Sequence, residues 1–418
     1  MLPGAIARAL AGQGGFRLLA QGAVCSPAAI WQLLAALNAG IVPLLLPPGL
    51  PAAKLAALRE RFPGFGVRTA DGIDWPDSPV RVEDGLYFGL LTSGSTGEPK
   101  AIVTSAARLA AGVQAIHVAQ GLGALRSTAL LLPLAYSFAC VNQLLWAVLL
   151  ERELHLPGPL TDMGTCLDNI RSGQVEMLCL VAQQTATLLR CAPPLVQVRC
   201  VNFAGSPFPM RHFEELRALF PHARLINNYG CAEAMPRLCC TEVTQATAST
   251  AFVGQPVGAI ELRIDQGAIE FRGPSAALGT IGSDGALRPF GDWIASGDLG
   301  SLDADGLYIM GRHDQVIKIG GERLTLLDVE QAFTAFGAHQ VLVWVEDGER
   351  IHAVIGMTAA PALRDLLQFL RQRLPRALLP AAIFYARDWP LNANQKTDRP
   401  ALQTRAGRGQ LDAIWPAP

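Results

Sequence analysis

The chain has 418 residues, a formal net charge of −1 at pH 7 and a hydrophobic fraction of 50%, while only 17% of its residues are charged. This length allows two or more domains, and the apolar fraction excludes global disorder because it supplies a large core. The near-zero charge argues against a nucleic-acid binder that depends on bulk positive charge, so we expect no nucleic-acid partner.

Cysteine usage favours a reducing compartment. The nine cysteines are scattered, none forms a Cys-x-x-Cys pair, and no histidine cluster accompanies them. We therefore expect buried, reduced thiols rather than a disulfide framework or a zinc site. The N-terminus lacks a basic segment followed by a long apolar stretch, so no signal peptide is expected. These features predict a cytoplasmic protein.

One uncharged window, residues 129–150, is long enough to cross a bilayer. Pro133, Asn142 and Gln143 interrupt it, and Pro133 divides a strand-like part from a helix-like part. This pattern favours a buried strand, loop and helix over a membrane span, so no transmembrane segment is expected.

Apolar periodicity in the first half of the chain predicts helices that alternate with buried strands. Residues 1–20 are expected to be helical and then extended. The helices expected further along are 27–38, 52–61, 105–120, 138–150 and 161–172, and the expected strands are 41–46, 128–132, 153–156 and 177–181. Such alternation is typical of layered α/β structure with a largely parallel sheet, in which ligands bind at the carboxyl ends of the strands.

The pattern changes after residue 250. Short runs that alternate apolar with polar residues predict antiparallel strands at 261–264 and 268–272, in a small β-barrel-like subdomain. Helices at 327–336 and 362–374, with strands at 340–346, 351–357 and 383–385, then predict a small α+β C-terminal domain. We place the boundary at Asp314, which gives domains 1–313 and 314–418, and we expect residues 404–418 to be loose.

A hydroxyl-rich loop that ends in lysine marks the candidate active site. It reads Thr92-Ser93-Gly94-Ser95-Thr96-Gly97-Glu98-Pro99-Lys100, and apolar runs on both sides predict a strand before it and after it. Glycines let backbone N–H groups converge on an anion, hydroxyls donate hydrogen bonds and lysine adds positive charge, so the loop suits phosphate binding. Its spacing does not match a Walker A loop. For the Ser-Gly-Ser-Thr-Gly part alone, a plain flexible turn is the alternative.

Further motifs follow this loop in order. They are Asn228-Tyr229-Gly230-Cys231-Ala232-Glu233, Trp293-Ile294-Ala295-Ser296-Gly297-Asp298-Leu299-Gly300, Gly311-Arg312-His313-Asp314 with Lys318-Ile319-Gly320-Gly321-Glu322-Arg323, and Asn392-Ala393-Asn394-Gln395-Lys396-Thr397-Asp398-Arg399. The ordered set closely resembles the adenylate-forming (AMP-binding) superfamily, which includes acyl- and aryl-CoA synthetases, nonribosomal peptide adenylation domains and luciferases. The resemblance covers roughly residues 30 to 402.

The resemblance implies a role for each motif. The β- and γ-phosphates of ATP would be held by Thr92, Ser93, Gly94, Ser95, Thr96, Gly97 and Lys100, and the adenine by Gly205, Ser206, Pro207, Asn228, Tyr229 and Gly230. Glu233 would position Mg²⁺, a hard cation that one carboxylate and phosphates can hold. Asp298 would bind the ribose hydroxyls, Arg312 the ribose and phosphate, and Lys396 the charge that develops during adenylation.

Each of these residues alone has a simpler explanation. Asp298 could be a turn residue, Arg312 part of a surface ion pair, and Lys396 an exposed lysine in a polar loop. Tyr229 could merely fill the core. Their place in the ordered set favours the functional interpretation, in which the catalytic residues are Lys396, Glu233, Arg312 and Thr92.

The chain departs from the family pattern at a few positions. Ala232 stands where the family usually has threonine, and Gln395 stands where it usually has glycine before the lysine. The aromatic motif that often carries histidine reads Pro133-Leu134-Ala135-Tyr136-Ser137-Phe138. These changes affect the expected rate and substrate more than the reaction class.

In this family a small C-terminal domain turns about a hinge residue, for which Asp314 is the candidate. Gly320 and Gly321 would then face an incoming pantetheine thiol, either of coenzyme A or of a carrier protein. Arg371, Arg373 and Arg376 could meet an acidic carrier protein or a 3′-phosphate, and a solvated basic face is the alternative.

The expected acid pocket is apolar, and it has no obvious aspartate for an α-amino group. Its candidate residues are Tyr136, Ser137, Phe138, Phe203, Ala204, Gly205, Cys231 and Met235. The resemblance thus implies an ATP- and Mg²⁺-dependent acid–thiol ligase for an aryl or fatty acid. A non-catalytic nucleotide-binding relative is the alternative.

Overall fold

The computed structural model describes residues 1–22, 27–45, 52–62, 66–68, 73–74, 88–93, 99–158, 162–191, 193–245, 251–281, 286–312, 316–319, 322–346, 350–390 and 397–415. The chain divides into two compact units. The larger contains Met1–Ser296 and Ser301–Ile309, and the smaller contains Gly297–Gly300 and Met310–Pro418. The predicted boundary at Asp314 lies just after this division, outside the described residues.

The described residues of the larger unit build a sheet that begins with parallel strands. In order across the sheet these are β1 (Arg17–Gly22), β8 (Glu153–Pro157), β7 (Ser127–Ala129), β9 (Met177–Leu180), β10 (Cys200–Phe203) and β11 (Arg224–Tyr229). The sheet continues through β12 (Cys239–Glu242), β13 (Phe252–Pro256), β19 (Leu307–Arg312), β18 (Ile294–Leu302), β15 (Ala268–Arg272) and β14 (Glu261–Asp265). The parallel strands place their carboxyl ends at one edge, where the polar loops after β10 and β11 begin.

A second sheet carries the candidate phosphate loop between two of its strands. Its described strands, in order, are β17 (Leu287–Pro289), β16 (Gly279–Ile281), β6 (Pro99–Thr104), β5 (Phe88–Ser93), β2 (Pro43–Leu45), β3 (Gly66–Arg68) and β4 (Ile73–Asp74). Strands β5 and β6 pair antiparallel, with Thr92 opposite Lys100. The two strands predicted on either side of the loop are thus confirmed, while residues 94–98 between them lie outside the described residues.

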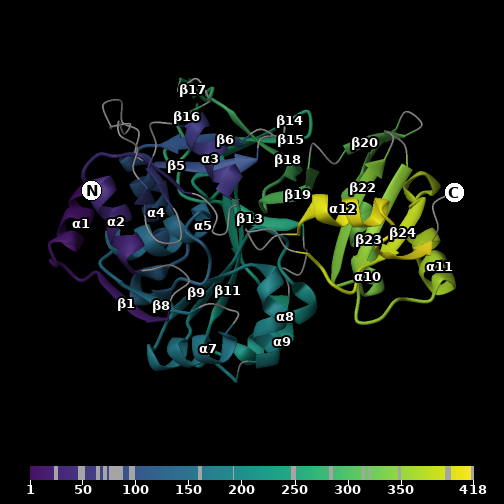
Figure 1. The fold of residues 1–418 in the computed structure, drawn as a ribbon, viewed down its shortest axis with the longest axis horizontal. Coiled ribbons are helices and arrows are strands. Elements are labelled where there is room, and N and C mark those ends of the chain that lie inside the picture. Colours follow the sequence, from purple (N-terminus) through teal and green to yellow (C-terminus); the bar gives the residue numbers. More distant parts are fainter. Residues whose placement is uncertain are drawn as a thin grey trace. The chain divides into compact units, whose positions relative to one another are not determined.

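Helices fill the space between the two sheets and cover the outer face of the first (Figure 1). One core joins residues of both sheets to α1 (Leu2–Leu10), α2 (Pro27–Asn38), α4 (Ala106–Ala119), α5 (Ser137–Ala139), the π-helical segment Cys140–Leu145 and α6 (Trp146–Leu149). A second core packs α7 (Met163–Ser172), α8 (Ala182–Cys191) and α9 (Phe213–Leu219) against the other face of the parallel strands. Both faces of these strands are therefore buried, which explains their continuous apolar runs.

Several predicted helices have the bounds that periodicity gave. Helix α2 and α3 (Ala52–Arg61) match the predictions residue for residue. Helix α4 is preceded by Ser105, whose hydroxyl accepts a hydrogen bond from Arg108 N at 3.3 Å and so caps the helix. Residues 129–150 form a strand end, a turn and the buried helical segment, and no helix among the described residues is long and apolar enough to cross a membrane.

The strands after residue 250 have a core of their own, which contains Ile269, Phe271 and Leu307. The predicted antiparallel pair is present as β14 and β15, which pair from Glu261 opposite Arg272 to Asp265 opposite Ala268. In hydrogen bonding, these strands extend the first sheet through β13, β18 and β19, while β16 pairs with β6 of the second sheet. The subdomain is therefore joined edge to edge with both larger sheets.

The C-terminal unit is α+β, as predicted. Its described strands are β20 (Val316–Ile319) paired with β21 (Glu322–Thr325), and a sheet in the order β22 (Gln340–Glu346), β23 (Arg350–Gly356), β24 (Ala382–Tyr385) and β25 (Asp412–Trp415). Its helices are α10 (Leu326–Phe336), α11 (Leu363–Arg373) and α12 (Arg399–Gly407).

The prediction of a loose tail was wrong. Asp398 caps α12 by accepting a hydrogen bond from Ala401 N at 3.0 Å, and a proline stands in the first turn of the helix. Leu402, Ala406 and Leu411 are buried in a small core, and β25 pairs with β24. Tertiary packing, which composition does not report, orders this segment.

We expect the smaller unit to lose stability as the pH rises, because of Glu330 on α10. Burial raises the pKa of Glu330 to about 7 from its ordinary 4.5, although Arg399 opposes the shift. A carboxyl whose folded pKa is raised stabilises the fold below pH 4.5 and loses that contribution between pH 4.5 and 7. Glu330→Gln should therefore raise the free energy of unfolding at pH 8 by about 1–3 kcal/mol.

Thermal unfolding at pH 5 and pH 8 checks this prediction. The melting temperature of Glu330→Gln should exceed that of the wild type at pH 8 and differ little at pH 5, where the wild-type carboxyl is largely neutral. Asp412→Asn, an exposed carboxylate on β25, is the control and should change neither value appreciably. An equal gain at both pH values would contradict the role given to Glu330.

Candidate functional site

The phosphate-loop motif begins and ends on described strands, but its central residues lie outside the described part of the chain. Thr92 and Ser93 end β5, and Pro99 and Lys100 begin β6. Residues 94–98, including Gly94, Ser95, Thr96 and Gly97, lie outside the described residues, as do the side chains of Thr92, Ser93 and Lys100. The hairpin brings both ends of the motif together, which its proposed role requires.

Glu233 lies in a tight loop between β11 and β12. The loop closes where Leu238 N donates to the carbonyl oxygen of Tyr229 at 2.9 Å, and Ala232–Ala234 form a 3₁₀ turn within it. Ala277 N donates to the backbone oxygen of Glu233 at 2.7 Å, so the backbone is anchored, and the Glu233 side chain is half-buried. A single such carboxylate, together with phosphates and waters, is a donor set that suits Mg²⁺.

A metal cage made by the protein alone is not present in the part of the chain that the structure describes. There, no group of three or more His, Cys, Asp or Glu side chains is placed to hold an ion. Glu233 is therefore suited to a cation that arrives with a phosphate ligand, not to a resident structural metal.

The Asn228 side chain is engaged by the protein. It is 4% exposed, and its amide nitrogen donates to Asn202 Oδ1 at 3.0 Å, Phe203 O at 3.1 Å and Ile226 O at 3.2 Å. Its amide oxygen accepts from Gln120 Nε2 at 2.6 Å. These bonds tie β10, β11 and the end of α4 together. In the predicted adenine slot, whose role stays a prediction, we therefore expect Asn228 to contribute its backbone.

The other adenine-slot residues are positioned by local geometry. Gly205 has φ +84° and follows β10, so glycine suits the turn there. A Cβ at Gly230 would overlap the carbonyl oxygen of Pro236, so this glycine is required by packing within the loop. Ser206 Oγ is buried and has no hydrogen-bond partner among the described residues, while Tyr229 Oη donates to Ser296 Oγ at 3.2 Å.

Asp298 and Arg312 are brought together, as the motif order implied. Arg312 Nη1 lies 3.4 Å from Asp298 Oδ1 on the neighbouring strands β18 and β19. The Asp298 carboxylate is 13% exposed and the Arg312 side chain is 53% exposed. Because the Arg312 side chain of this pair is largely exposed, the ion pair contributes little to stability, and its arrangement is consistent with ligand binding.

The predicted pocket residues separate into different cores. Tyr136, Phe138, Ala204 and Met235 belong to the core between the sheets. The structure corrects the placement predicted for Phe203. The centre of its ring lies 4.9 Å from that of Phe208, in the core on the opposite face of the sheet. Neighbouring residues on a strand point to opposite faces, so Phe203 and Ala204 could not both line one pocket with their side chains.

Cys231 does not belong to the core between the sheets either. It packs with Tyr229 against the core of the strands after residue 250. Ser137 begins α5, and Gly205 is exposed in the turn after β10. Burial raises the pKa of the Tyr136 phenol, so this group is neutral throughout the physiological range.

Sequence reasoning missed Arg237, which is 3% exposed and places its guanidinium 5.1 Å from the ring centre of Phe138. Nothing in the local sequence distinguishes this arginine from the many at the surface. Lys396, Asp314, Gly320 and Gly321 lie outside the described residues, so their predicted roles remain proposals.

Comparison with known proteins agrees with this arrangement. Residues 66–279, just over half of the chain, match the family model described as AMP-binding enzyme. The chain belongs to this AMP-binding, adenylate-forming family.

Two relatives and one solved structure are informative. The chain is 28% identical over 353 residues to 2-succinylbenzoate–CoA ligase of Bacillus velezensis, covering 78% of this chain and 70% of the relative. It is 29% identical over 227 residues to L-proline–[L-prolyl-carrier protein] ligase of Pseudomonas fluorescens, covering 49% and 44%. O-succinylbenzoate coenzyme A synthetase of Bacillus subtilis, in complex with ATP and magnesium ion, superimposes with a TM-score of 0.76 at 21% identity, covering 96% and 92%.

Proposed function

We propose that this protein is an AMP-forming acid–thiol ligase. It activates a carboxylic acid with ATP, releases pyrophosphate, and transfers the acyl group to a phosphopantetheine thiol. The observation that supports this proposal is that a chain of this family has the Thr92–Lys100 hairpin and the Glu233 loop at the end of β11 in its larger unit. The Asp298–Arg312 pair lies in the smaller unit.

The chemistry explains why these residue types are needed. The acid's carboxylate oxygen attacks the α-phosphorus of ATP, and the bond to the bridging oxygen of pyrophosphate breaks. Two anions must approach each other, so oriented donors and positive charge are required around the phosphates. In this proposal the hydroxyls of Thr92 and Ser93 and the Lys100 ammonium bind the outgoing phosphates, and Arg312 and Lys396 stabilise the charge that develops.

Mg²⁺ would be bound through the Glu233 carboxylate. When present it neutralises phosphate charge and orients the triphosphate. Ala232 supplies no hydroxyl at the neighbouring position, so the protein relies on the remaining donors of the phosphate loop. Asp298, which accepts hydrogen bonds, would fix the ribose.

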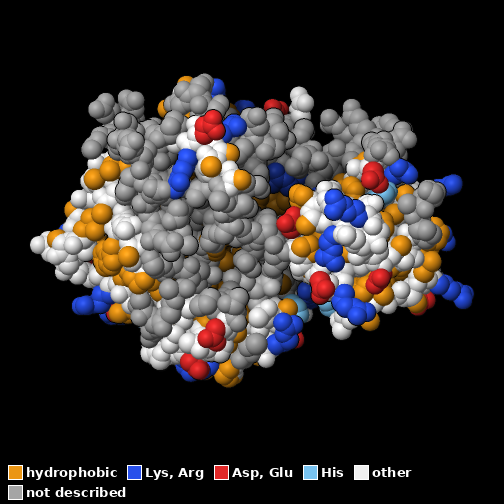
Figure 2. Space-filling view, in the orientation of Figure 1, with side chains coloured by type: hydrophobic (Ala, Val, Ile, Leu, Met, Phe, Trp, Pro, Cys, Tyr) orange, Lys and Arg blue, Asp and Glu red, His pale blue; other side chains and the backbone are white. Residues whose placement is uncertain are grey.

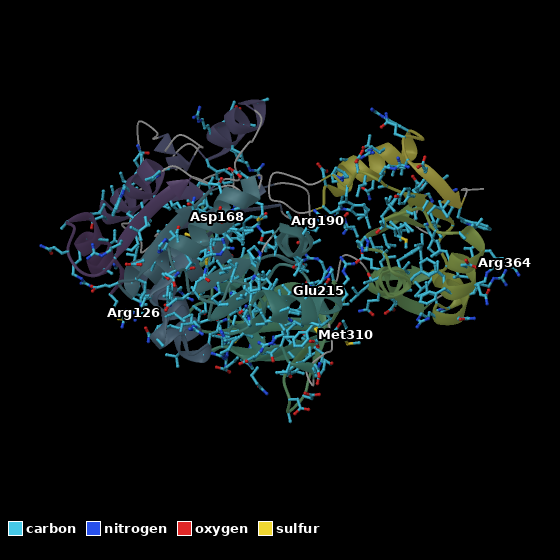
Figure 3. The ribbon with its side chains drawn as sticks, turned by 90° about the horizontal axis from the view of Figure 1, so that it is seen from below. Arg126, Asp168, Arg190, Glu215, Met310 and Arg364 are labelled. Carbon is cyan, nitrogen blue, oxygen red and sulfur yellow. The ribbon has the colours of Figure 1, made fainter. Side chains whose placement is uncertain are left out.

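The acceptor is the second half of the proposal. Residues 314–418 would act as a mobile lid that turns about Asp314 and presents Gly320 and Gly321 to the thiol. Arg364 and Arg371 line an open hollow on α11, and Figure 3 shows Arg364 pointing away from its unit. Basic and acidic side chains are mixed on the face of this unit seen in Figure 2, so coenzyme A and a carrier protein both stay candidates.

ATP–pyrophosphate exchange over a panel of acids tests the adenylation step, and trapping with coenzyme A or a phosphopantetheinylated carrier tests the transfer. Exchange that requires both an acid and Mg²⁺ is expected. In Glu233→Gln the Mg²⁺ concentration for half-maximal exchange should rise by about tenfold or more, whereas Glu242→Gln, which removes an exposed ion pair with Arg224, should behave as the wild type. ATP binding without exchange for any acid would favour the non-catalytic alternative.

A further inference from the structure

Arg237 is a buried cation without a counter-ion among the described residues. Its side chain is 3% exposed, and Nε and Nη2 have no hydrogen-bond partner there. Its guanidinium lies 5.1 Å from the centre of the Phe138 ring, and the thiols of Cys179, Cys239 and Cys240 interact with it electrostatically. Burial lowers the pKa of Arg237 to about 10, which still leaves the guanidinium charged at neutral pH.

The loop that carries Glu233 also fixes the position of Arg237. Leu238, the next residue, closes the loop onto Tyr229, and a Cβ at Gly230 would lie 3.0 Å from Arg237 Cα. The guanidinium extends to Phe138, at the start of the helical segment that continues into Cys140–Leu145. Arg237 therefore spans from the Glu233 loop to a predicted residue of the acid pocket.

A second unsatisfied polar group lies on the same helical segment. Asn142 is 3% exposed, and neither its amide oxygen nor its amide nitrogen has a hydrogen-bond partner among the described residues. It comes one turn after Phe138, in a π-helical stretch of a kind that is frequent at functional sites. Buried polar groups in native proteins are normally paired, so Asn142 and Arg237 both call for a partner other than the residues that the structure describes.

The identity of that partner follows from the free atoms of the arginine. Nε and Nη2 form one edge of the guanidinium, and their two N–H groups point in parallel. This edge matches the two oxygens of a carboxylate in a bidentate pair. An uncharged ligand would leave the buried charge uncompensated, which is unfavourable in an apolar interior.

We propose that Arg237 binds a second carboxylate on the acid substrate, so that the enzyme activates dicarboxylic acids in preference to simple aryl or fatty acids. This inference rests on the proposed function, whose substrate class it narrows. It also revises the expectation of an apolar acid pocket, because Arg237 would supply a buried positive charge beside Phe138. Arg237 is a specificity-determining residue here, because the carboxylate it binds is not the one that reacts.

Exchange with matched acids tests the proposal. Isophthalate is compared with benzoate, and adipate with hexanoate, for the wild type, Arg237→Met and Arg237→Lys. The wild type should favour each dicarboxylate by about 100-fold or more, since a site built to pair with a polar group discriminates strongly against ligands that lack it. Arg237→Met should lose that preference. Arg237→Lys should retain part of it, because lysine keeps the positive charge but cannot make the two parallel hydrogen bonds of a guanidinium.

Melting temperatures separate this role from a structural one. Removal of an unpaired buried charge should leave the melting temperature of Arg237→Met equal to or above that of the wild type, whereas loss of a structural contact would lower it. Isophthalate should raise the melting temperature of the wild type and not of Arg237→Met. Arg263→Met, in which an exposed arginine stacked 4.4 Å from the Trp293 ring centre is removed, is the control and should keep the wild-type preference.

The possible outcomes are distinct. Equal exchange with mono- and dicarboxylates, or a lower melting temperature with unchanged preference in Arg237→Met, would overturn the inference and leave the ligase proposal standing. Weaker ATP binding in Arg237→Met would assign the arginine to the nucleotide and also overturn it. If isophthalate stabilises the protein through Arg237 but no acid supports exchange, the anion site is supported and the ligase proposal is rejected. If isophthalate does not stabilise the protein and no acid supports exchange, both proposals are rejected.

Discussion

Replacing Lys396 with alanine is expected to reduce acid-dependent pyrophosphate exchange by about two to three orders of magnitude, while ATP binding persists. The proposed role of the ammonium is to neutralise charge that develops as the carboxylate attacks the α-phosphorus. A group whose interaction appears mainly in the transition state lowers the rate when removed but changes ground-state affinity little. Exchange kinetics and an ATP titration on the same preparation measure the two effects separately.

The chain offers a matched control for this experiment. Its lysines are Lys54, Lys100, Lys318 and Lys396, and of these Lys54, on α3, belongs to none of the motifs. Lys54→Ala should therefore exchange like the wild type. Lys100→Ala should differ from Lys396→Ala by weakening ATP binding as well, because its proposed partners are phosphates present before the reaction. Full exchange activity in Lys396→Ala would remove the role proposed for this residue.

Replacing Asn228 with alanine is expected to lower the free energy of unfolding by about 2–4 kcal/mol, with a much smaller effect on ATP affinity in the folded protein. The change removes the partner of the buried Gln120 amide and the bonds to Asn202 and to two backbone carbonyls. Each buried polar group left without a partner costs about 1–3 kcal/mol. Urea denaturation followed by tryptophan fluorescence measures the loss, and Trp146 supplies a buried reporter in the same unit.

Gln255→Ala is the control, because the Gln255 amide is exposed and donates to Ala304 O at 3.0 Å, so its loss should cost less than about 0.5 kcal/mol. The opposite result for Asn228→Ala, little change in stability but an ATP affinity reduced tenfold or more, would show that the amide serves the nucleotide. The prediction thus separates a residue that holds three elements together from one that contacts the ligand.

Local sequence patterns determined the family and most regular elements of this protein. Motif residues such as Asp298 and Arg312 are identified by type and order, because the chemistry at a phosphate site admits few alternatives. Periodicity gave the bounds of α2, α3, β15 and β22. The error at residues 404–418 arose from composition, which suggested a loose tail although Asp398 and Pro400 mark a helix start.

Tertiary structure alone decided which side chains share a pocket and which charges are buried. Phe203 and Ala204 are adjacent in the chain but belong to cores on opposite faces of the sheet. One hydrogen bond of Asn228 joins it to Gln120, more than a hundred positions away in the chain. The environment of Arg237 includes Phe138 and Cys179 from other segments. Burial and pairing depend on neighbours brought together by folding, so no local pattern around these residues could have revealed them.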